Sequence, residues 1–300
     1  MRNGGIRLII CAALAALATG FATPAHAQQG NQQLSRRLVQ QDAPAVAARA
    51  AYLFDATTGT VRLSKQATRR LPVASLTKVM TAYVVLREAK PDDVVTINSG
   101  DVRHATTNGA TAANLRAGER LTVRDLLYGA MLPSGADATH ALARVYGPGD
   151  SRFVAKMNAT ARSLGLTRTR YGNPDGLPKP SPGYSTAQDQ AKLAEVALRD
   201  PVLLAIASTA RHAVAASKVH LAHVWTNSNK LLGASAGAVG LKTGYTQAAG
   251  YCLSFAADRD GHRIVGVLLG DSSATRRFQT AARLLNWAGE QTAGGGSEDV

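Results

Sequence analysis

Residues 72–88 read PVASLTKVMTAYVVLRE and combine a helical pattern with two side chains that can do chemistry. The apolar residues recur at helical spacing and form one stripe, which predicts an amphipathic helix. Ser75 and Lys78 stand three positions apart, so both face the same side of that helix. A serine hydroxyl is a poor nucleophile until a base removes its proton. Lys78 can be that base if burial and a nearby positive charge lower its pKa, although Ser-x-x-Lys also occurs by chance at the start of a solvated helix.

A second candidate is Ser134, in the sequence PSGADA of residues 133–138. It lies at a loop between two predicted helices, residues 123–132 and 137–145. The Ser134 hydroxyl could exchange a proton with a neighbouring amine. It could equally cap the second helix, because serine is a favoured N-cap residue, and taken alone the sequence favours the cap.

The third candidate is Lys242-Thr243-Gly244, placed just before a strand-like run. A second amine at Lys242 would lower the pKa of the first by repulsion, and it would attract a substrate carboxylate. Thr243 adds a hydroxyl donor, and Gly244 lets a substrate backbone approach closely. Each of the three elements is common alone, and their occurrence together in this order carries the interpretation.

With these motifs the chain resembles the SxxK acyl-transferases and, among them, the low-molecular-weight penicillin-binding proteins of the D-alanyl-D-alanine carboxypeptidase family. The resemblance extends from about residue 51 to 287. The segments that carry it are residues 72–82, 121–127, 157–158, 164–165, 173–177, 184–187 and 240–246. It implies an α+β fold of the β-lactamase and transpeptidase type, with an antiparallel sheet flanked by helices and a helical subregion.

The resemblance also implies a mechanism. Ser75 attacks the carbonyl of the penultimate D-Ala, with Lys78 as general base, and Ser134 with Lys242 relays a proton to the leaving amine. Lys242 and Thr243 hold the terminal carboxylate, while the backbone N–H groups of Ser75 and Tyr245 form the oxyanion hole. The expected partners are peptidoglycan stem peptides ending in D-Ala-D-Ala, with β-lactam antibiotics as inhibitors. No cofactor and no metal is expected.

One departure from the family concerns its second motif, Ser-x-Asn, which here reads Ser134-Gly135-Ala136. The missing amide normally contacts Lys78 and the substrate backbone. Losing a buried hydrogen bond costs about 1–3 kcal/mol, which predicts slower acylation or altered specificity with Ser75 still reactive. A further β-rich domain and a C-terminal anchor, found in many members, are not expected after Trp287.

Three other functions were weighed. A β-lactamase would need an element for a deacylating water between Ser134 and Lys242, and no convincing Glu-x-x-x-Asn is present there. A penicillin-recognising pseudo-enzyme or scaffold draws support from Ala136. A metallopeptidase is disfavoured because the seven histidines include no His-Glu-x-x-His.

The N-terminus predicts export. Residues 1–27 have a basic start, the apolar run IICAALAAL and the cleavage sequence AHA, as in a signal peptide, so the protein is expected in the periplasm or cell envelope. No later run is long enough to predict an integral membrane segment. The charge is +14 with the leader and +12 without Arg2 and Arg7. Export excludes nucleic acid as a partner of this basic chain.

The remaining pattern places one domain at residues 50–290, after a flexible arm at 28–49 and before a disordered tail at 291–300. Hairpins are predicted at 51–63 and 250–269, and helices at 153–164, 186–199 and 273–289. Residues 171–183 form a proline-rich loop. Cys252, the one cysteine beyond the leader, is interpreted as a buried, inert strand residue.

Overall fold

The computed structural model describes residues 43–293, and their side chains as far as residue 291. The predicted signal peptide, residues 28–42 of the predicted arm and residues 294–300 lie outside the described residues. Residues 43–49 belong to the folded part: Ala48 is buried, and Arg49 donates hydrogen bonds to the carbonyls of Ala248 and Ala249 at 3.0 and 2.6 Å.

The central element is a five-stranded sheet in the order β2-β1-β9-β8-β7, with every pair antiparallel. Its strands are β1 (Ala50–Asp55), β2 (Val61–Lys65), β7 (Ala238–Thr246), β8 (Gly250–Arg259) and β9 (His262–Asp271). Both predicted hairpins are confirmed. The second has a tighter turn than expected, because Arg259 pairs with His262, which leaves Asp260 and Gly261, both at positive φ, as a two-residue turn.

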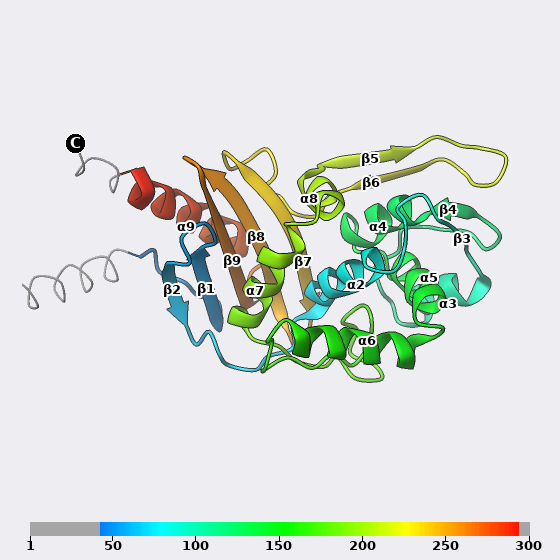
Figure 1. Cartoon of the computed structure of the whole chain (residues 1–300), viewed down its shortest axis with the longest axis horizontal. Helices are drawn as coiled ribbons and strands as arrows, with labels where there is room; N and C mark the ends of the chain where they lie inside the picture. Colours follow the sequence, from blue (N-terminus) through cyan, green and yellow to red (C-terminus); the bar gives the residue numbers. More distant parts are fainter. Residues whose placement is uncertain (1–42, 294–300) are drawn as a thin grey trace, which may run out of the picture. The chain divides into compact units, whose positions relative to one another are not determined.

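Helices cover both faces of this sheet, which explains why the inner strands β1, β8 and β9 are largely apolar on both sides (Figure 1). Helix α9 (Arg276–Ala293) packs on one face and α7 (Ala187–Ala197) on the other. Alternate strand residues serve two cores. Leu253 and Phe255 face α9, while Cys252 and Ala256 belong to the larger core on the α7 side.

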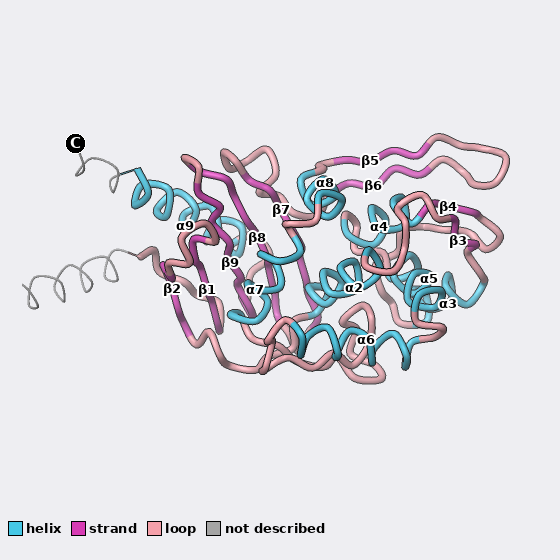
Figure 2. Tube along the Cα trace, viewed as in Figure 1, coloured by secondary structure: helices cyan, strands magenta, loops and turns pink. Residues whose placement is uncertain are grey.

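A helical subregion lies beyond β7, as Figure 2 shows by the grouping of the helices there. It consists of the short 3₁₀ helix η1 and five α-helices. Their bounds are η1 Ala74–Leu76, α2 Thr77–Leu86, α3 Ser99–Thr107, α4 Val123–Met131, α5 Ala136–Tyr146 and α6 Asp150–Ser163. The predicted α+β class, with an antiparallel sheet and a helical subregion, is confirmed.

Several elements were not predicted. They are α3, α8 (Pro201–Ser208), β4 (Arg120–Thr122) and the antiparallel ladder of β5 (Arg211–Val214) with β6 (His223–Thr226). Strand β4 pairs with β3 (Val94–Thr96), which lies in a stretch, residues 94–97, that the sequence shows as β-like. Helix α3 buries only Asp101 and Ala105, so its sequence has no apolar stripe, and a capping box at Asn98 fixes its start instead. Among the described residues, no helix is both long and apolar enough to span a bilayer.

Candidate active site

Ser75 lies in η1, directly before α2, and its hydroxyl faces Lys78. The Lys78 Nζ lies 3.2 Å from Ser75 Oγ and donates a 2.9 Å hydrogen bond to the carbonyl of Asp175. Ala74, just before the serine, has a φ of +50°, a left-handed conformation that is uncommon for alanine. The predicted nucleophile and base are therefore in hydrogen-bond contact, at a strained entry to the helix.

Lys78 is almost completely enclosed, with 1% of its surface exposed. Burial lowers the pKa of its ammonium group, and the carboxylates of Asp175 and Asp137 oppose that shift. The net direction is downward, which favours the uncharged amine that a general base requires.

Lys242 is equally buried, also at 1%. Its pKa lies well below the ordinary value because of burial and because of the positive charges of Lys78 and Arg277. The Lys242 Nζ donates to the carbonyl of Thr243 at 3.1 Å. The charge of Lys78 thus acts on Lys242, whereas the sequence analysis expects Lys242 to lower the pKa of Lys78, and that effect stays a prediction.

The Lys242-Thr243-Gly244 segment precedes strand β8 as predicted, and it lies itself within β7, at the edge of the sheet, a strand that was not predicted. Its place in the fold explains the glycine. A Cβ at Gly244 would lie 3.1 Å from the backbone nitrogen of Ser75 and 3.0 Å from the carbonyl oxygen of Val73. Gly244 therefore brings the main chain leading to Tyr245 directly against the nucleophile segment. The Tyr245 side chain points outward and stacks on Tyr251 at 4.4 Å between ring centroids.

Ser134 does not cap α5, so that alternative is wrong. The N-cap of α5 is Gly135, which makes no side-chain cap, and Ser134 has a left-handed φ of +72°. Its Oγ is buried and has no hydrogen-bond partner. Leaving a buried hydroxyl unpaired costs about 1–3 kcal/mol, so this group is unsatisfied in the free protein and available to a substrate or an amine.

Two hydrogen bonds place the Ser134 loop beside β7. The backbone nitrogen of Ser228 donates to the Leu132 carbonyl at 3.0 Å, and Ser228 Oγ lies 2.6 Å from Thr243 Oγ1. Ser228 was not predicted as a site residue. The side chains of the flanking Asn227 and Asn229 contact main-chain groups instead.

Ala136 occupies the position of the missing amide and is completely buried at the start of α5. Asp137 does not replace that amide. Its carboxylate accepts hydrogen bonds from the backbone nitrogens of Ala113 and Leu115 at 2.7 and 3.1 Å.

Arg277 is a second residue that the sequence did not reveal. It lies in the first turn of α9, and its Nη1 donates to the carbonyls of Gly244 and Cys252, each at 2.9 Å. The guanidinium also lies over the Tyr251 ring, 5.2 Å from its centroid. Arg277 therefore fixes β7 and adds positive charge near Lys242. Cys252 is buried as predicted, and burial raises the pKa of its thiol to about 11.

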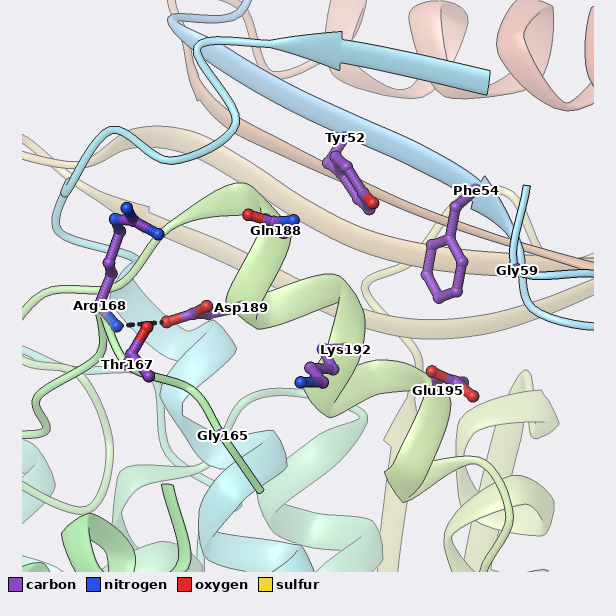
Figure 3. Close-up of a pocket in the computed structure, with 10 residues that line it drawn as sticks. All are labelled: Tyr52, Phe54, Gly59, Gly165, Thr167, Arg168, Gln188, Asp189, Lys192 and Glu195. Atoms are coloured by element: carbon purple, nitrogen blue, oxygen red, sulfur yellow. Dashed lines mark hydrogen bonds between the residues drawn. The ribbon is translucent and has the colours of Figure 1, made fainter. Parts of the chain in front are cut away.

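A separate cavity of about 400 Å³ lies elsewhere, between β1 and α7 (Figure 3). Tyr52 and Phe54 extend from the strand, and Lys192 and Glu195 from the helix. None of the predicted catalytic or substrate-binding residues lines it. Among the described residues, no three His, Cys, Asp or Glu side chains are arranged as metal ligands would be. The Ser75 site is therefore the candidate for the chemistry.

Comparison with known proteins gives the same assignment. Residues 37–273 match the family model described as D-alanyl-D-alanine carboxypeptidase. The D-alanyl-D-alanine carboxypeptidase of Streptomyces sp. strain K15 is 35% identical over 299 residues, covering 96% of this chain and 98% of that protein. The D-alanyl-D-alanine endopeptidase of Pseudomonas aeruginosa is 32% identical over 244 residues, covering 81% of this chain and 77% of that protein.

Solved structures agree in fold as well as sequence. The crystal structure of the Streptomyces K15 DD-transpeptidase superposes with a TM-score of 0.77 at 37% identity, covering 82% of this chain and 98% of that one. The match extends through both the sheet and the helical subregion that meet at Ser75. The chain belongs to the D-alanyl-D-alanine carboxypeptidase family of serine peptidases.

Proposed function

We propose that Ser75 is the acyl-ester nucleophile and Lys78 the general base of this serine D-Ala-D-Ala peptidase. We further propose that its substrate is a peptidoglycan stem peptide ending in D-Ala-D-Ala. The observation that carries this proposal is the 3.2 Å contact between Lys78 Nζ and Ser75 Oγ, made by a lysine that is buried and has a lowered pKa. The intact pair argues against a scaffold that only recognises penicillin.

Acylation begins when the uncharged Lys78 amine accepts the Ser75 proton. Ser75 Oγ then forms a bond to the carbonyl carbon of the penultimate D-Ala, and the negative oxygen that develops is met by the backbone N–H groups of Ser75 and Tyr245. As the intermediate collapses, the C–N bond to the terminal D-Ala breaks. Its amine takes a proton through Ser134, whose hydroxyl has no other partner. Water then hydrolyses the ester and frees Ser75.

Substrate binding would also redistribute charge between the two lysines. The terminal carboxylate of the substrate would lie against Lys242 and the Thr243 hydroxyl. A carboxylate there raises the pKa of Lys242, which otherwise has only positive neighbours, and favours its ammonium form. The repulsion that follows favours the free amine at Lys78. Substrate binding would in this way favour the uncharged form of Lys78, which acts as the general base.

A second candidate is the cleavage of peptide crosslinks. It is favoured by the similarity to the Pseudomonas aeruginosa endopeptidase, and by β7 being a sheet edge along which an extended peptide could bind. Ala136, in place of an amide that would contact the substrate backbone, is the residue we expect to alter this preference.

The setting of this activity is inferred from the sequence. The signal peptide predicted at residues 1–27 supports export to the periplasm or cell envelope, where the stem peptides are found. The same acylation chemistry supports inhibition by β-lactams, which would form an ester with Ser75.

The test is digestion of defined muropeptides followed by mass measurement of the products. A pentapeptide that loses one D-Ala supports the carboxypeptidase, and a crosslinked dimer that splits into monomers supports the endopeptidase. The Ser75→Ala protein is the control. Turnover of either substrate by Ser75→Ala would contradict the proposal. So would the absence of any turnover by the wild-type protein.

A further inference from the structure

Asp175 contacts both the general base and a histidine of the helical subregion. Its main-chain carbonyl accepts the 2.9 Å hydrogen bond from Lys78 Nζ, and its carboxylate Oδ2 lies 2.6 Å from Nε2 of His104 on α3. The Asp175 side chain is 2% exposed and that of His104 is 18% exposed. Asp175 therefore connects its pair with His104 to the Lys78 amine, which must accept the Ser75 proton.

The carbonyl of Asp175 has a defined task. An uncharged amine has two N–H groups and one lone pair. When one N–H is fixed on the Asp175 carbonyl, the lone pair can be directed at the Ser75 hydroxyl. Any shift of residue 175 would therefore turn the amine relative to the nucleophile.

The segment around Asp175 is held from several sides. Thr81 Oγ1 on α2 donates to the Pro174 carbonyl at 2.5 Å, and Asn173 Oδ1 accepts from the backbone nitrogen of Gly176 at 2.6 Å. Gly176 has a φ of +80°, and a Cβ there would lie 1.9 Å from the Ala74 carbonyl oxygen. The segment thus packs directly on the residue that precedes Ser75, and His104 is its contact on the side of α3.

His104 is itself held in one orientation. Its ring stacks on that of His140 on α5, with centroids 4.5 Å apart. His140 Nδ1 lies 2.7 Å from Oδ1 of Asp101, a buried carboxylate that also pairs with Arg144. The Nε2 of His104 is consequently aimed at Asp175 by contacts that do not involve the active site.

The charges in this cluster act on the lysine. The hydrogen bond to Asp175 raises the pKa of His104, which favours the imidazolium. Burial raises the pKa of Asp175, but the His104 hydrogen bond and the charge of Lys78 outweigh it and leave that pKa below its ordinary value. The ion pair is therefore the favoured state, and the imidazolium offsets a carboxylate that would otherwise raise the pKa of Lys78.

The other charged groups around the two titrating residues are few. For Lys78 they are the Asp137 carboxylate and Lys242, and for His104 they are Asp150, Lys78 and the stacked His140. All of these remain in place when residue 104 alone is changed.

We propose that His104 is a positioning residue for acylation: acting through Asp175, it holds the carbonyl that orients Lys78 and neutralises the carboxylate that faces this lysine. This inference rests on the proposed roles of Ser75 and Lys78. It adds a residue outside the three motifs, and it predicts a dependence on pH that a purely structural residue would not give.

The experiment compares His104→Gln, Asp175→Asn and the double variant. Glutamine keeps a donor at the place of Nε2 but carries no charge. The readout is the pH dependence of the second-order rate constant for acylation by a fluorescent penicillin, whose acid limb reports the loss of the proton from Lys78. Melting curves establish that each variant is folded.

In His104→Gln the Asp175 carboxylate has no counter-charge and raises the pKa of Lys78 further. The acid limb of the acylation rate should therefore move about one pH unit higher. In Asp175→Asn the carboxylate that raises the pKa of Lys78 is gone, so the acid limb should move to lower pH. The double variant should follow Asp175→Asn, because there is no charge left for residue 104 to neutralise. The two single variants test the inference independently, because their acid limbs are expected to move in opposite directions. If one of them fails to fold, the other still gives a result.

The matched control is His262→Gln, which removes a histidine that pairs with Asp55 at 2.7 Å, on β9 and β1 and outside the Ser75 site. Its limb should coincide with that of the wild type. An acid limb that stays in place in both His104→Gln and Asp175→Asn, even if the rate falls evenly at every pH, would overturn the inference. A wild-type protein that never acylates would instead overturn the proposed function, and this inference with it.

Discussion

Substitution of Gly244 by alanine tests whether β7 must approach the nucleophile as closely as the structure shows. A Cβ at this position would lie 3.0 Å from Leu76 Cδ1 and the Val73 carbonyl oxygen, and 3.1 Å from the Ser75 nitrogen. Ordinary contacts begin at 3.4 Å, so the three fall 0.3–0.4 Å short. The backbone of Gly244 does not have a positive φ, so alanine adds no dihedral strain.

The magnitude follows from that displacement. Moving reacting groups by about 1 Å can cost about 100-fold in rate, so a shift of a few tenths of an ångström should reduce acylation by about tenfold. The crowding should also destabilise the fold by about 1 kcal/mol. The Ser75 nitrogen is one of the two backbone atoms that this Cβ would crowd and is also a proposed oxyanion donor, so the rate should suffer more than the stability.

The assay is stopped-flow acylation by a chromogenic β-lactam, together with thermal unfolding. Gly289→Ala is the matched control. It lies on α9, where the three atoms nearest to an added Cβ would be side-chain carbons of Arg259 at 3.7–4.0 Å, an ordinary contact distance. Alanine should stabilise that helix by up to about 1 kcal/mol and leave acylation unchanged. A folded Gly244→Ala protein that acylates at the wild-type rate would refute the assigned contact between β7 and Ser75.

Three further outcomes are expected. Lys242→Met should lower kcat/KM for D-Ala release by about 10- to 100-fold, because a charge-assisted contact is lost, whereas Lys230→Met, at an exposed position, should have no effect. Equal rates in the two variants would contradict the proposal that Lys242 binds the terminal carboxylate of the substrate. The pKa of Asp101 is lowered to about 2, since its hydrogen bonds to His140 and Arg144 outweigh burial. A carboxyl whose pKa is lower in the folded than in the unfolded protein stabilises the fold at any pH above its unfolded pKa. About 2 kcal/mol of the free energy of unfolding should therefore be lost as the pH falls from about 4 to 2, and melting curves of Asp101→Asn should lack this loss. Cys252, with its thiol pKa raised to about 11, should react with iodoacetamide only after unfolding, and labelling of the native protein would contradict its burial.

Much of the sheet was predictable because its strands are covered on both faces. Continuous apolar runs such as residues 250–257 have no other place in a soluble domain than a buried strand. The segment of Lys242 and Gly244 was misread because lysine and glycine are poor strand formers. Their strand conformation is imposed by pairing with β8 and by contact with η1, which are tertiary effects.

The helical subregion was harder to predict where helices are short and polar. Helix α8 has a readable start, since Asp200 caps it and Pro201 occupies its first turn, yet its eight residues are too few to show a clear period. The β5–β6 ladder is short and half exposed, and its histidines gave no apolar alternation. Both elements owe their existence to neighbours that are distant in sequence.

At the site, the residues within recognisable motifs were predicted and the residues that support them were not. Ser75, Lys78 and Lys242 lie in three spaced motifs. The main-chain carbonyl of Asp175 accepts from the Lys78 side chain 97 positions away, and the Arg277 side chain donates to the Gly244 carbonyl 33 positions away. Such contacts leave no local pattern. For Ser134 the local sequence alone favoured a helix cap and the family resemblance implied a proton relay, and its unpartnered hydroxyl supports the relay.

The central claim is that an uncharged lysine activates one serine. Its most direct test is peptide mapping by mass spectrometry after reaction with benzylpenicillin across a range of pH. A single ester adduct is expected on the peptide that contains Ser75, forming more slowly as pH falls and absent from Ser75→Ala and Lys78→Met. An adduct on any other residue, or undiminished labelling of Lys78→Met, would contradict it.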